Sequence, residues 1–307
     1  MTTFVPKELI KGLQKNKKRI SSKYFYDKKG SELFDKICDL DEYYLTRTEF
    51  KILKENLSCI AECFTDDSLL VEFGSGSSTK TRLLLENIDN LGGYVPIDIS
   101  KKHLEQEVEK LEREFPSLDI HPLAADYSKP LTLPQVHNEA EQRIIFFPGS
   151  SIGNFTLKES REFFETIRNE IEIGDGFILG ADLVKNKNVL EAAYNDSQNV
   201  TAEFNLNILQ NINNRFGSNF NLNNYKHDAI YNEEENRIEM HLRSLVNQQV
   251  KIGSTEIFFR ENELLLTEYS HKYSLESIKK LCDGLFSISR YWTDKQKYFG
   301  VFYLEPV

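Results

Sequence analysis

Leu69-Leu-Val-Glu-Phe-Gly-Ser-Gly-Ser-Ser-Thr-Lys80 is the stretch of sequence that decides the fold. Its first five residues are apolar except for Glu72, which is typical of a buried strand. A turn with two glycines follows at once, and the residues from Thr79 onward have the pattern of a helix. In such a turn the backbone N–H groups come close to a ligand, because glycine has no Cβ in the way. The stretch therefore predicts the start of an α/β sheet with a binding turn at its edge.

The alternation of strands and helices continues along the chain. Further strands are predicted over 93–98, 120–125, 143–147 and 176–181, and helices over 79–90, 101–115 and 157–171. Strands separated by helices of this length indicate a parallel sheet with right-handed crossovers. After a helix over 274–284, two apolar strands over 286–292 and 299–304 are expected to return to the same sheet.

An inserted unit interrupts this sheet. Residues 186–215 have the pattern of one long helix. Residues 236–246, 249–260 and 264–273 alternate between apolar and polar side chains, as half-buried antiparallel strands do. Residues 1–65 also read as helical, with a capping box at Thr46 and Glu49 opening one of the helices. We therefore predict two discontinuous domains, one formed by 49–184 and 272–307 and the other by 1–48 and 185–271.

The composition excludes several classes of protein. The chain has 307 residues, of which 40% are hydrophobic, and a formal charge of −10, which is typical of a soluble globular protein. The one dense basic run, 15–19, is interpreted as a solvated helix end, so no nucleic-acid partner is expected. No apolar stretch is long enough for a membrane span or a secretory signal, so we expect a cytoplasmic monomer with no membrane partner. The four cysteines and six histidines lack metal-ligand spacing, so no metal is expected.

The glycine turn has four possible interpretations. It can bind a dinucleotide, the phosphates of a nucleotide as a P-loop does, or S-adenosylmethionine, or it can be an ordinary strand-to-helix turn without a ligand. The dinucleotide fingerprint needs a third glycine where this chain has Thr79, and a P-loop needs a glycine directly before Lys80. S-adenosylmethionine (SAM) has no phosphate, so it needs fewer backbone N–H groups. It needs two glycines and an acidic residue at the end of the first strand, and Gly74, Gly76 and Glu72 fit that description.

Two further carboxylates strengthen the SAM interpretation. Asp98 ends the second predicted strand, where a carboxylate can accept hydrogen bonds from both ribose hydroxyls. Asp126 ends the third strand and suits the exocyclic amine of adenine, while Tyr127 can line the base. One acidic residue at a strand end is often only a turn former. With Glu72, however, three successive strands end in a carboxylate, which predicts SAM at the carboxyl edge of the sheet.

Nine segments resemble, in order along the chain, the histidine Nα-methyltransferases of ergothioneine biosynthesis, which make hercynine (Nα,Nα,Nα-trimethylhistidine). They are Tyr24-Phe-Tyr-Asp27, Glu42-Tyr-Tyr-Leu-Thr-Arg-Thr-Glu49, Val71-Glu-Phe-Gly-Ser-Gly76, Pro148-Gly-Ser-Ser-Ile-Gly-Asn154, Ala181-Asp-Leu-Val-Lys185, Ala193-Tyr-Asn-Asp196, Val200-Thr-Ala-Glu-Phe-Asn205, Arg237-Ile-Glu-Met-His-Leu-Arg243 and Leu266-Thr-Glu-Tyr-Ser270. The resemblance extends from about residue 24 to about residue 303. It implies a Rossmann-like SAM-dependent methyltransferase sheet with a discontinuous α+β substrate-binding domain, and three successive methyl transfers from SAM to L-histidine.

The resemblance also implies roles for individual residues. Its SAM-binding positions are Tyr26, Gly74, Lys80, Asp98, Asp126 and Tyr127, the last of which stands where relatives often have Phe. Its positions for the substrate's amino and carboxylate groups are Tyr43, Asn154 and Tyr194. Its positions around the imidazole are Met240, which packs against the ring, and Glu268 and Ser270, which hydrogen-bond to it.

The residue chemistry agrees with these roles. A carboxylate and a hydroxyl can satisfy the two ring nitrogens of histidine, and an apolar ring would leave Glu268 buried and unpaired. Without the resemblance, Glu268 would read as a solvent-facing strand residue and Asn154 as a helix N-cap. Tyr43, Tyr194 and Met240 would read as core residues.

The expected reaction is in-line displacement at the SAM methyl group by a neutral α-amino nitrogen. Tyr43 is the candidate catalytic partner of the amine, although a phenol with a pKa near 10 is a poor base at neutral pH. Its ring can also attract the growing cation. Two alternatives remain: the same chemistry on another aromatic amino acid or amine, and a SAM-binding protein without catalysis. Glu268 with Ser270 argues against an indole, and Asn154 with Tyr194 argues for a carboxylate.

Overall fold

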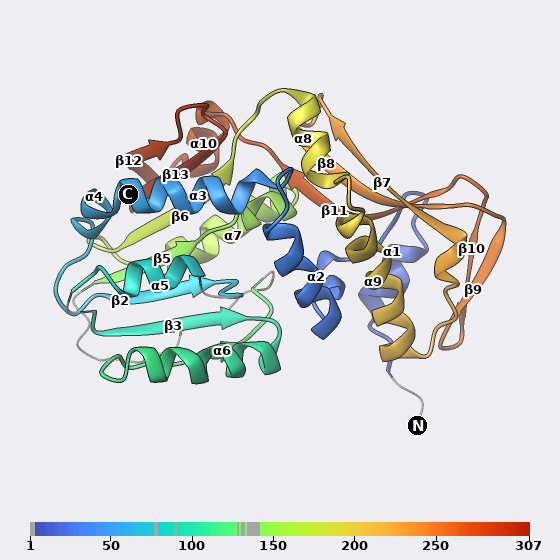
Figure 1. Cartoon of the computed structure of the whole chain (residues 1–307), viewed down its shortest axis with the longest axis horizontal. Helices are drawn as coiled ribbons and strands as arrows, with labels where there is room; N and C mark the ends of the chain where they lie inside the picture. Colours follow the sequence, from blue (N-terminus) through green and yellow to red (C-terminus); the bar gives the residue numbers. More distant parts are fainter. Residues whose placement is uncertain (1–3, 77–78, 90, 128, 130–132, 134–141) are drawn as a thin grey trace. The chain divides into compact units, whose positions relative to one another are not determined.

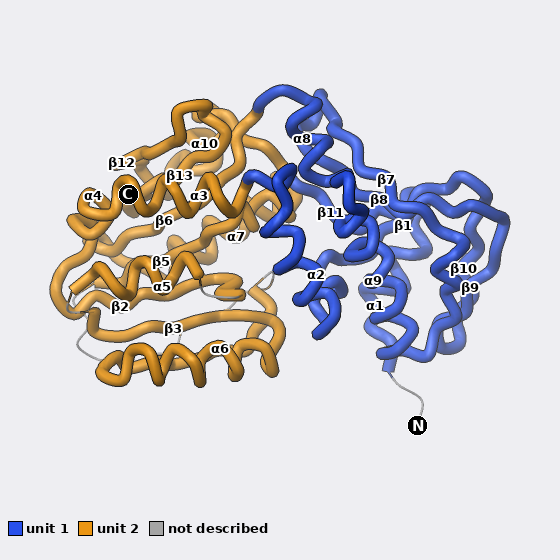
Figure 2. The backbone as a smooth tube through the Cα atoms, in the orientation of Figure 1, with its two compact units in different colours: residues 1–44, 185–270 blue, residues 45–184, 271–307 orange. Residues whose placement is uncertain are grey.

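The computed structural model describes residues 4–76, 79–89, 91–127, 129, 133 and 142–307 (Figure 1). The chain divides into two compact units, each made of separate stretches (Figure 2). Unit 1 comprises residues 1–44 and 185–270, and unit 2 comprises residues 45–184 and 271–307. The chain passes from one unit to the other after residues 44, 184 and 270, whereas the sequence predicts domain boundaries after residues 48, 184 and 271. The assignment of substrate binding to the first of these units stays a prediction.

Unit 2 is built on a seven-stranded sheet with the order β12-β13-β6-β5-β2-β3-β4. Its strands are β2 (Leu69–Phe73), β3 (Gly93–Asp98), β4 (Leu123–Ala124), β5 (Arg143–Phe147), β6 (Gly176–Asp182), β12 (Phe286–Thr293) and β13 (Phe299–Pro306). The strands from β2 to β6 pair in parallel, while β13 pairs antiparallel with β6 and β12 antiparallel with β13. The predicted α/β sheet, and the return of the last two strands to it, are confirmed.

Helices cover both faces of this sheet. They are α3 (Tyr44–Glu55), which starts at the unit boundary, α4 (Leu57–Ala61), α5 (Thr79–Leu85), α6 (Lys101–Glu114), the 3-10 turn η2 (Ser151–Asn154), α7 (Leu157–Glu170) and α10 (Leu275–Cys282). Alternate residues of a strand point to opposite faces. Leu69, Val71 and Phe73 accordingly share a buried apolar cluster with residues of α7 and α10. Glu72 points the other way and accepts a hydrogen bond from Thr81 of α5.

Unit 1 contains a four-stranded sheet with the order β1-β11-β8-β7 and a separate β9-β10 hairpin. The strands are β1 (Lys18–Arg19), β7 (Tyr225–Asn232), β8 (Arg237–Ser244), β9 (Gln248–Ile252), β10 (Thr255–Phe259) and β11 (Leu264–His271). The helices are α1 (Lys7–Leu13), α2 (Lys28–Cys38), α8 (Lys187–Tyr194) and α9 (Val200–Phe216), with 3-10 turns η1 (Ser22–Phe25) and η3 (Leu222–Asn224). Among the described residues, no helix has both the length and the low polarity needed to cross a membrane.

Several local expectations were wrong in unit 1. The long helix predicted over 186–215 is two helices, because Asn199 has a left-handed backbone (φ 60°) and the Asp196 carboxylate accepts the first N–H groups of α9. The strand predicted over 249–260 is a hairpin that turns at Gly253 (φ 58°). β7 was not predicted, because its polar residues hide the alternation of its buried ones.

Two expectations near the N-terminus were also wrong. The basic run over 15–19 is not a helix end, since Lys18 and Arg19 form β1 and pair in parallel with β11. Thr46 and Glu49 do not form a capping box, because α3 already begins at Tyr44 and Glu49 lies inside it. Glu49 instead belongs to the edge of the unit 2 sheet, as described below.

Candidate active site

The glycine turn after β2 is shaped by two left-handed residues. Gly74 has φ 73° and Gly76 has φ 47°, a backbone conformation that side chains with a Cβ rarely adopt. A Cβ on Gly74 would lie 3.2 Å from the Tyr127 hydroxyl. The N–H of Gly76 donates to Asp98 Oδ2 over 3.4 Å. The turn thus joins the ends of β2 and β3; its Ser77 and Ser78 lie outside the described residues.

Asp98 and Tyr127 meet Gly74 at this edge of the sheet. Asp98 also accepts the Ser100 N–H through Oδ1 over 2.8 Å, and burial raises the pKa of its carboxyl. Burial, and then the Asp98 and Asp126 charges, raise the pKa of Tyr127, so its phenol stays protonated. The Asp126 carboxylate forms an ion pair with Lys129, with 3.4 Å between Oδ2 and Nζ.

These residues fit an adenosyl ligand. The Asp98 carboxylate accepts the Gly76 N–H at Oδ2 and the Ser100 N–H at Oδ1, and each carboxylate oxygen can accept a further hydrogen bond from a hydroxyl. The Ser75 hydroxyl is buried and has no partner among the described residues. The absence of a side chain at Gly74 makes room for the Tyr127 hydroxyl beside the turn. The part of the chain that the structure describes holds no cluster of three metal-ligating side chains.

Glu72 does not belong to the binding edge, contrary to the sequence analysis. Its side chain is buried and accepts hydrogen bonds from Thr81 Oγ1, over 2.6 Å, and from the Tyr94 hydroxyl. Burial raises the pKa of the Glu72 carboxyl to about 7, against the lowering effect of these hydrogen bonds and of Lys80. Strand alternation explains the difference, since Glu72 lies one residue before the end of β2 and points into the layer under α5.

We expect the Glu72 carboxyl to make stability depend on pH. The unfolded carboxyl titrates near 4.5 and the folded one near 7. Its stabilising contribution is therefore complete below 4.5 and is lost as the pH rises through 7, an effect of about 3 kcal/mol. Urea unfolding at about pH 5 and about pH 8 should show Glu72→Gln gaining stability relative to the wild type at the higher pH. The exposed Glu86→Gln serves as the control, and an unchanged difference between Glu72→Gln and wild type at both pH values would refute the expectation.

Glu49 is a site residue that sequence reasoning missed. It lies on α3, is fully buried, and forms an ion pair with Lys80 at the start of α5. Its two carboxylate oxygens also accept the Gly149 N–H, over 3.0 and 2.8 Å. Gly180 of β6 makes room for it, because a Cβ there would lie 2.0 Å from Glu49 Oε1. Lys80, a predicted SAM-binding residue, is thereby held by a carboxylate of the protein itself.

Unit 1 gathers the predicted substrate-binding hydroxyls. The Tyr194 hydroxyl, at the end of α8, lies 2.7 Å from Ser270 Oγ on β11. The Tyr43 ring stands edge-on to the Tyr194 ring, with 6.1 Å between centroids. Burial, and then the charges of Tyr194, Cys38 and Glu268, raise the pKa of Tyr43 well above its ordinary value. Tyr43 is therefore a protonated phenol that Glu268 influences electrostatically.

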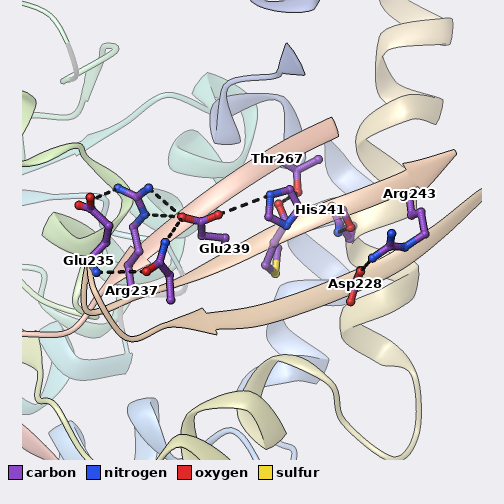
Figure 3. Close-up of polar contacts among 10 residues, drawn as sticks. Asp228, Glu235, Arg237, Glu239, His241, Arg243 and Thr267 are labelled. Carbon is purple, nitrogen blue, oxygen red and sulfur yellow. Dashed lines mark hydrogen bonds and ion pairs between the residues drawn. The ribbon is translucent and has the colours of Figure 1, made fainter. Parts of the chain in front are cut away.

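The faces of the unit 1 sheet separate two sets of side chains. Arg237, Glu239 and His241 follow one another along one face of β8 (Figure 3). The Arg237 guanidinium also lies 3.9 Å from the centre of the Tyr269 ring. Met240 lies between Glu239 and His241, and Glu268 and Ser270 flank Tyr269, so strand alternation places all three on the opposite face.

His227 is a second residue that sequence reasoning missed, and it holds the backbone of Tyr194 in place. The His227 ring lies on β7, and its Nε2–H donates to the Tyr194 carbonyl over 2.8 Å. Its Nδ1 accepts from the Asn205 amide over 2.8 Å, an arrangement that fits the neutral ring. Burial lowers the pKa of His227, which favours the same form. The end of α8 is thus fixed to the sheet beside Ser270.

In each predicted set, substrate-binding and SAM-binding, one residue belongs to a different unit from the other five. Asn154 ends η2 in unit 2, whereas the other five predicted substrate residues belong to unit 1. Tyr26 belongs to unit 1, where its ring stands edge-on to Phe34, whereas the other five predicted SAM residues belong to unit 2. Asn154 is not a helix N-cap, because Thr156 caps α7.

Known proteins resemble this chain along nearly its whole length. The model of a family described as SAM-dependent, histidine-specific methyltransferases matches residues 5–306. The chain is 37% identical to histidine N-alpha-methyltransferase of Mycobacterium tuberculosis, across 96% of this chain and 92% of that protein. It is 27% identical to ergothioneine biosynthesis protein 1 of Schizosaccharomyces pombe, across 91% of this chain and 37% of that protein. A solved SAM-dependent methyltransferase from Anabaena variabilis shares the fold, with a TM-score of 0.50, 10% identity and coverage of 90% and 95% of the two chains.

Proposed function

The chain belongs to the family of SAM-dependent, histidine-specific methyltransferases, and on this premise we propose that it methylates the α-amino group of L-histidine three times to give hercynine. The family expected from the nine sequence segments is thereby confirmed. The observation that carries the proposal is the full-length match to the histidine-specific family. It is supported by the carboxylate and hydroxyl on one face of β11, which suit an imidazole.

Recognition of histidine is assigned to unit 1. Glu268 and Ser270 are two residues apart on β11 and share a face, so they can pair with the two nitrogens of one ring. Met240, which is 1% exposed, supplies an apolar surface on the same face of the sheet. Tyr194 already contacts Ser270. Together with Asn154 and Tyr43, it is proposed to hold the amino and carboxylate groups.

SAM is assigned to the edge of the unit 2 sheet, with Gly74, Lys80, Asp98, Asp126 and Tyr127 as its proposed contacts, and Tyr26 as a contact from unit 1. When bound, SAM supplies an electrophilic methyl group on a sulfonium. The Asp98 carboxylate is proposed to accept the ribose hydroxyls, and its raised pKa agrees with a group that gains from such donors.

Tyr43 is the proposed catalytic residue. Its raised pKa keeps the phenol protonated, so we assign it a role in orienting the amine rather than in removing its proton. Each transfer forms an N–C bond and breaks the S–C bond of the sulfonium. The nitrogen must be neutral before each attack, and its proton leaves to solvent. Alignment of the two reactants can lower the barrier of such a reaction by up to about 7–11 kcal/mol. The Tyr43 and Tyr194 rings can stabilise the growing cation.

The proposed function predicts a single product from a mixed pool. Incubation of the protein with SAM and the twenty amino acids should yield histidine carrying three added methyl groups, detected by mass spectrometry. Histamine and tryptophan, each supplied separately, are the controls for the carboxylate and the ring. Methylation of tryptophan or histamine instead of histidine would contradict the substrate assignment, and SAM binding without any product would contradict catalysis.

A further inference from the structure

The Glu49–Lys80 pair places two opposite charges at the proposed SAM site. Glu49 is fully buried, and the Lys80 side chain is only 15% exposed. Lys80 is the sole cation within ion-pair distance of Glu49 in the described part of the chain. A buried carboxylate without its partner would be costly, so the pair forms before any ligand arrives.

The surroundings of Glu49 fix where its charge lies. The Gly149 N–H binds both carboxylate oxygens, and the bare Cα of Gly180 leaves just enough space for one of them. A Cβ on Gly149 would lie 3.6 Å from Lys80 Nζ, so the same loop also borders the ammonium. The Lys80 charge lowers the pKa of Glu72 and the Asp98 charge raises it, so both charges lie close enough to act on that buried carboxyl.

This arrangement has a consequence for a cationic ligand. SAM carries one more positive charge than its product S-adenosylhomocysteine, because methyl transfer turns the sulfonium into a thioether. An unneutralised Lys80 ammonium would repel SAM more than the product. Both ligands carry the same carboxylate and amino groups, so direct contacts of Lys80 with those groups affect them equally.

We propose that Glu49 is a positioning residue that neutralises Lys80, and that it thereby sets the preference of the site for the sulfonium of SAM over S-adenosylhomocysteine. This inference rests on the proposed SAM site and is independent of which amine is methylated. Glu49 touches neither ligand in this role and acts through the ammonium of Lys80.

The test compares the dissociation constants of SAM and S-adenosylhomocysteine, measured by isothermal titration without any amine substrate. In Glu49→Gln, which keeps the shape and loses the charge, SAM binding should weaken on the order of tenfold more than S-adenosylhomocysteine binding. Adding Lys80→Met to Glu49→Gln should restore the wild-type ratio, even if both ligands bind more weakly. Glu55→Gln, an exposed carboxylate on the same helix, is the matched control and should leave the ratio unchanged.

Gly180→Ala provides a second route if Glu49→Gln does not fold. Its methyl group would displace the Glu49 carboxylate from Lys80 without removing the charge, so the ratio should move in the same direction. Equal weakening of both ligands in Glu49→Gln, or an unchanged ratio in folded Gly180→Ala, would overturn the inference and leave Glu49 as a structural residue. Failure of the wild-type protein to bind SAM would instead overturn the proposed function.

Discussion

Replacing Glu268 with alanine is expected to raise the dissociation constant of histidine roughly 100-fold while leaving that of SAM nearly unchanged. A hydrogen bond to a charged group contributes about 1.5–3 kcal/mol, and the half-buried Glu268 carboxylate lies on the face of β11 that also carries Ser270. The loss should be confined to histidine, because Glu268 belongs to unit 1 and the five main SAM positions belong to unit 2. Isothermal titration of each ligand alone measures both constants.

Two further variants sharpen this expectation. Glu268→Gln keeps the size of the side chain but can donate as well as accept, so it should weaken histidine binding less than Glu268→Ala. Glu256→Ala removes an exposed carboxylate of the β9-β10 hairpin in the same unit and should change neither constant. Equal losses for histidine and SAM in Glu268→Ala would contradict the assignment of Glu268 to the imidazole.

Lys272→Met is expected to cause the largest loss of stability. Lys272 follows β11, and its ammonium lies 2.8 Å from Asp182 Oδ2 at the end of β6, with both side chains fully buried. Removal of one partner leaves a buried charge without its counterion, at a cost of about 3–5 kcal/mol. Urea unfolding followed by circular dichroism should therefore show a much lower midpoint than in the wild type.

The effect should come from the loss of the buried ion pair rather than from the loss of the lysine side chain itself. Lys272→Met combined with Asp182→Asn removes both charges and should recover part of the lost stability. Lys279→Met, on the exposed surface of α10, is the matched control and should stay near the wild type. If Lys272→Met unfolds at the same urea concentration as Lys279→Met, the pair does not contribute as expected.

The parts of the fold that could be predicted are those with local signals. The apolar run before the Gly74 turn and the helices between strands suffice for the seven-stranded sheet, because each element carries its own periodicity. β1 could not be predicted, since it has two residues and exists only through its pairing with β11. The break before α9 depends on a single left-handed residue, Asn199, which few local patterns distinguish from helix.

The candidate site shows the same division. The positions of Gly74 and Asp98 at the carboxyl edge of the sheet could be predicted, because each stands at the end of an apolar run, whereas their contacts with SAM stay predictions. Glu49 was interpreted as a helix cap because its true partners, Lys80 and Gly149, are distant in the sequence. Glu72 is predicted at the end of β2, but the strand continues for one more residue, to Phe73. This difference of one residue places the Glu72 side chain in the interior instead of at the binding edge.

Unit 1 is made of two separate stretches of the chain, so its core cannot be completed during synthesis until the second stretch has been translated. The N-terminal helices emerge from the ribosome first, but α2 and η1 pack against α9, and β1 pairs with β11. Until those later elements are translated, the apolar faces of the first helices have nothing to cover them. The sheet of unit 2 is likewise incomplete until β13 is made. Residues 7–38 therefore keep uncovered apolar faces in the growing chain until α9 and β11 have been translated, and such faces favour aggregation.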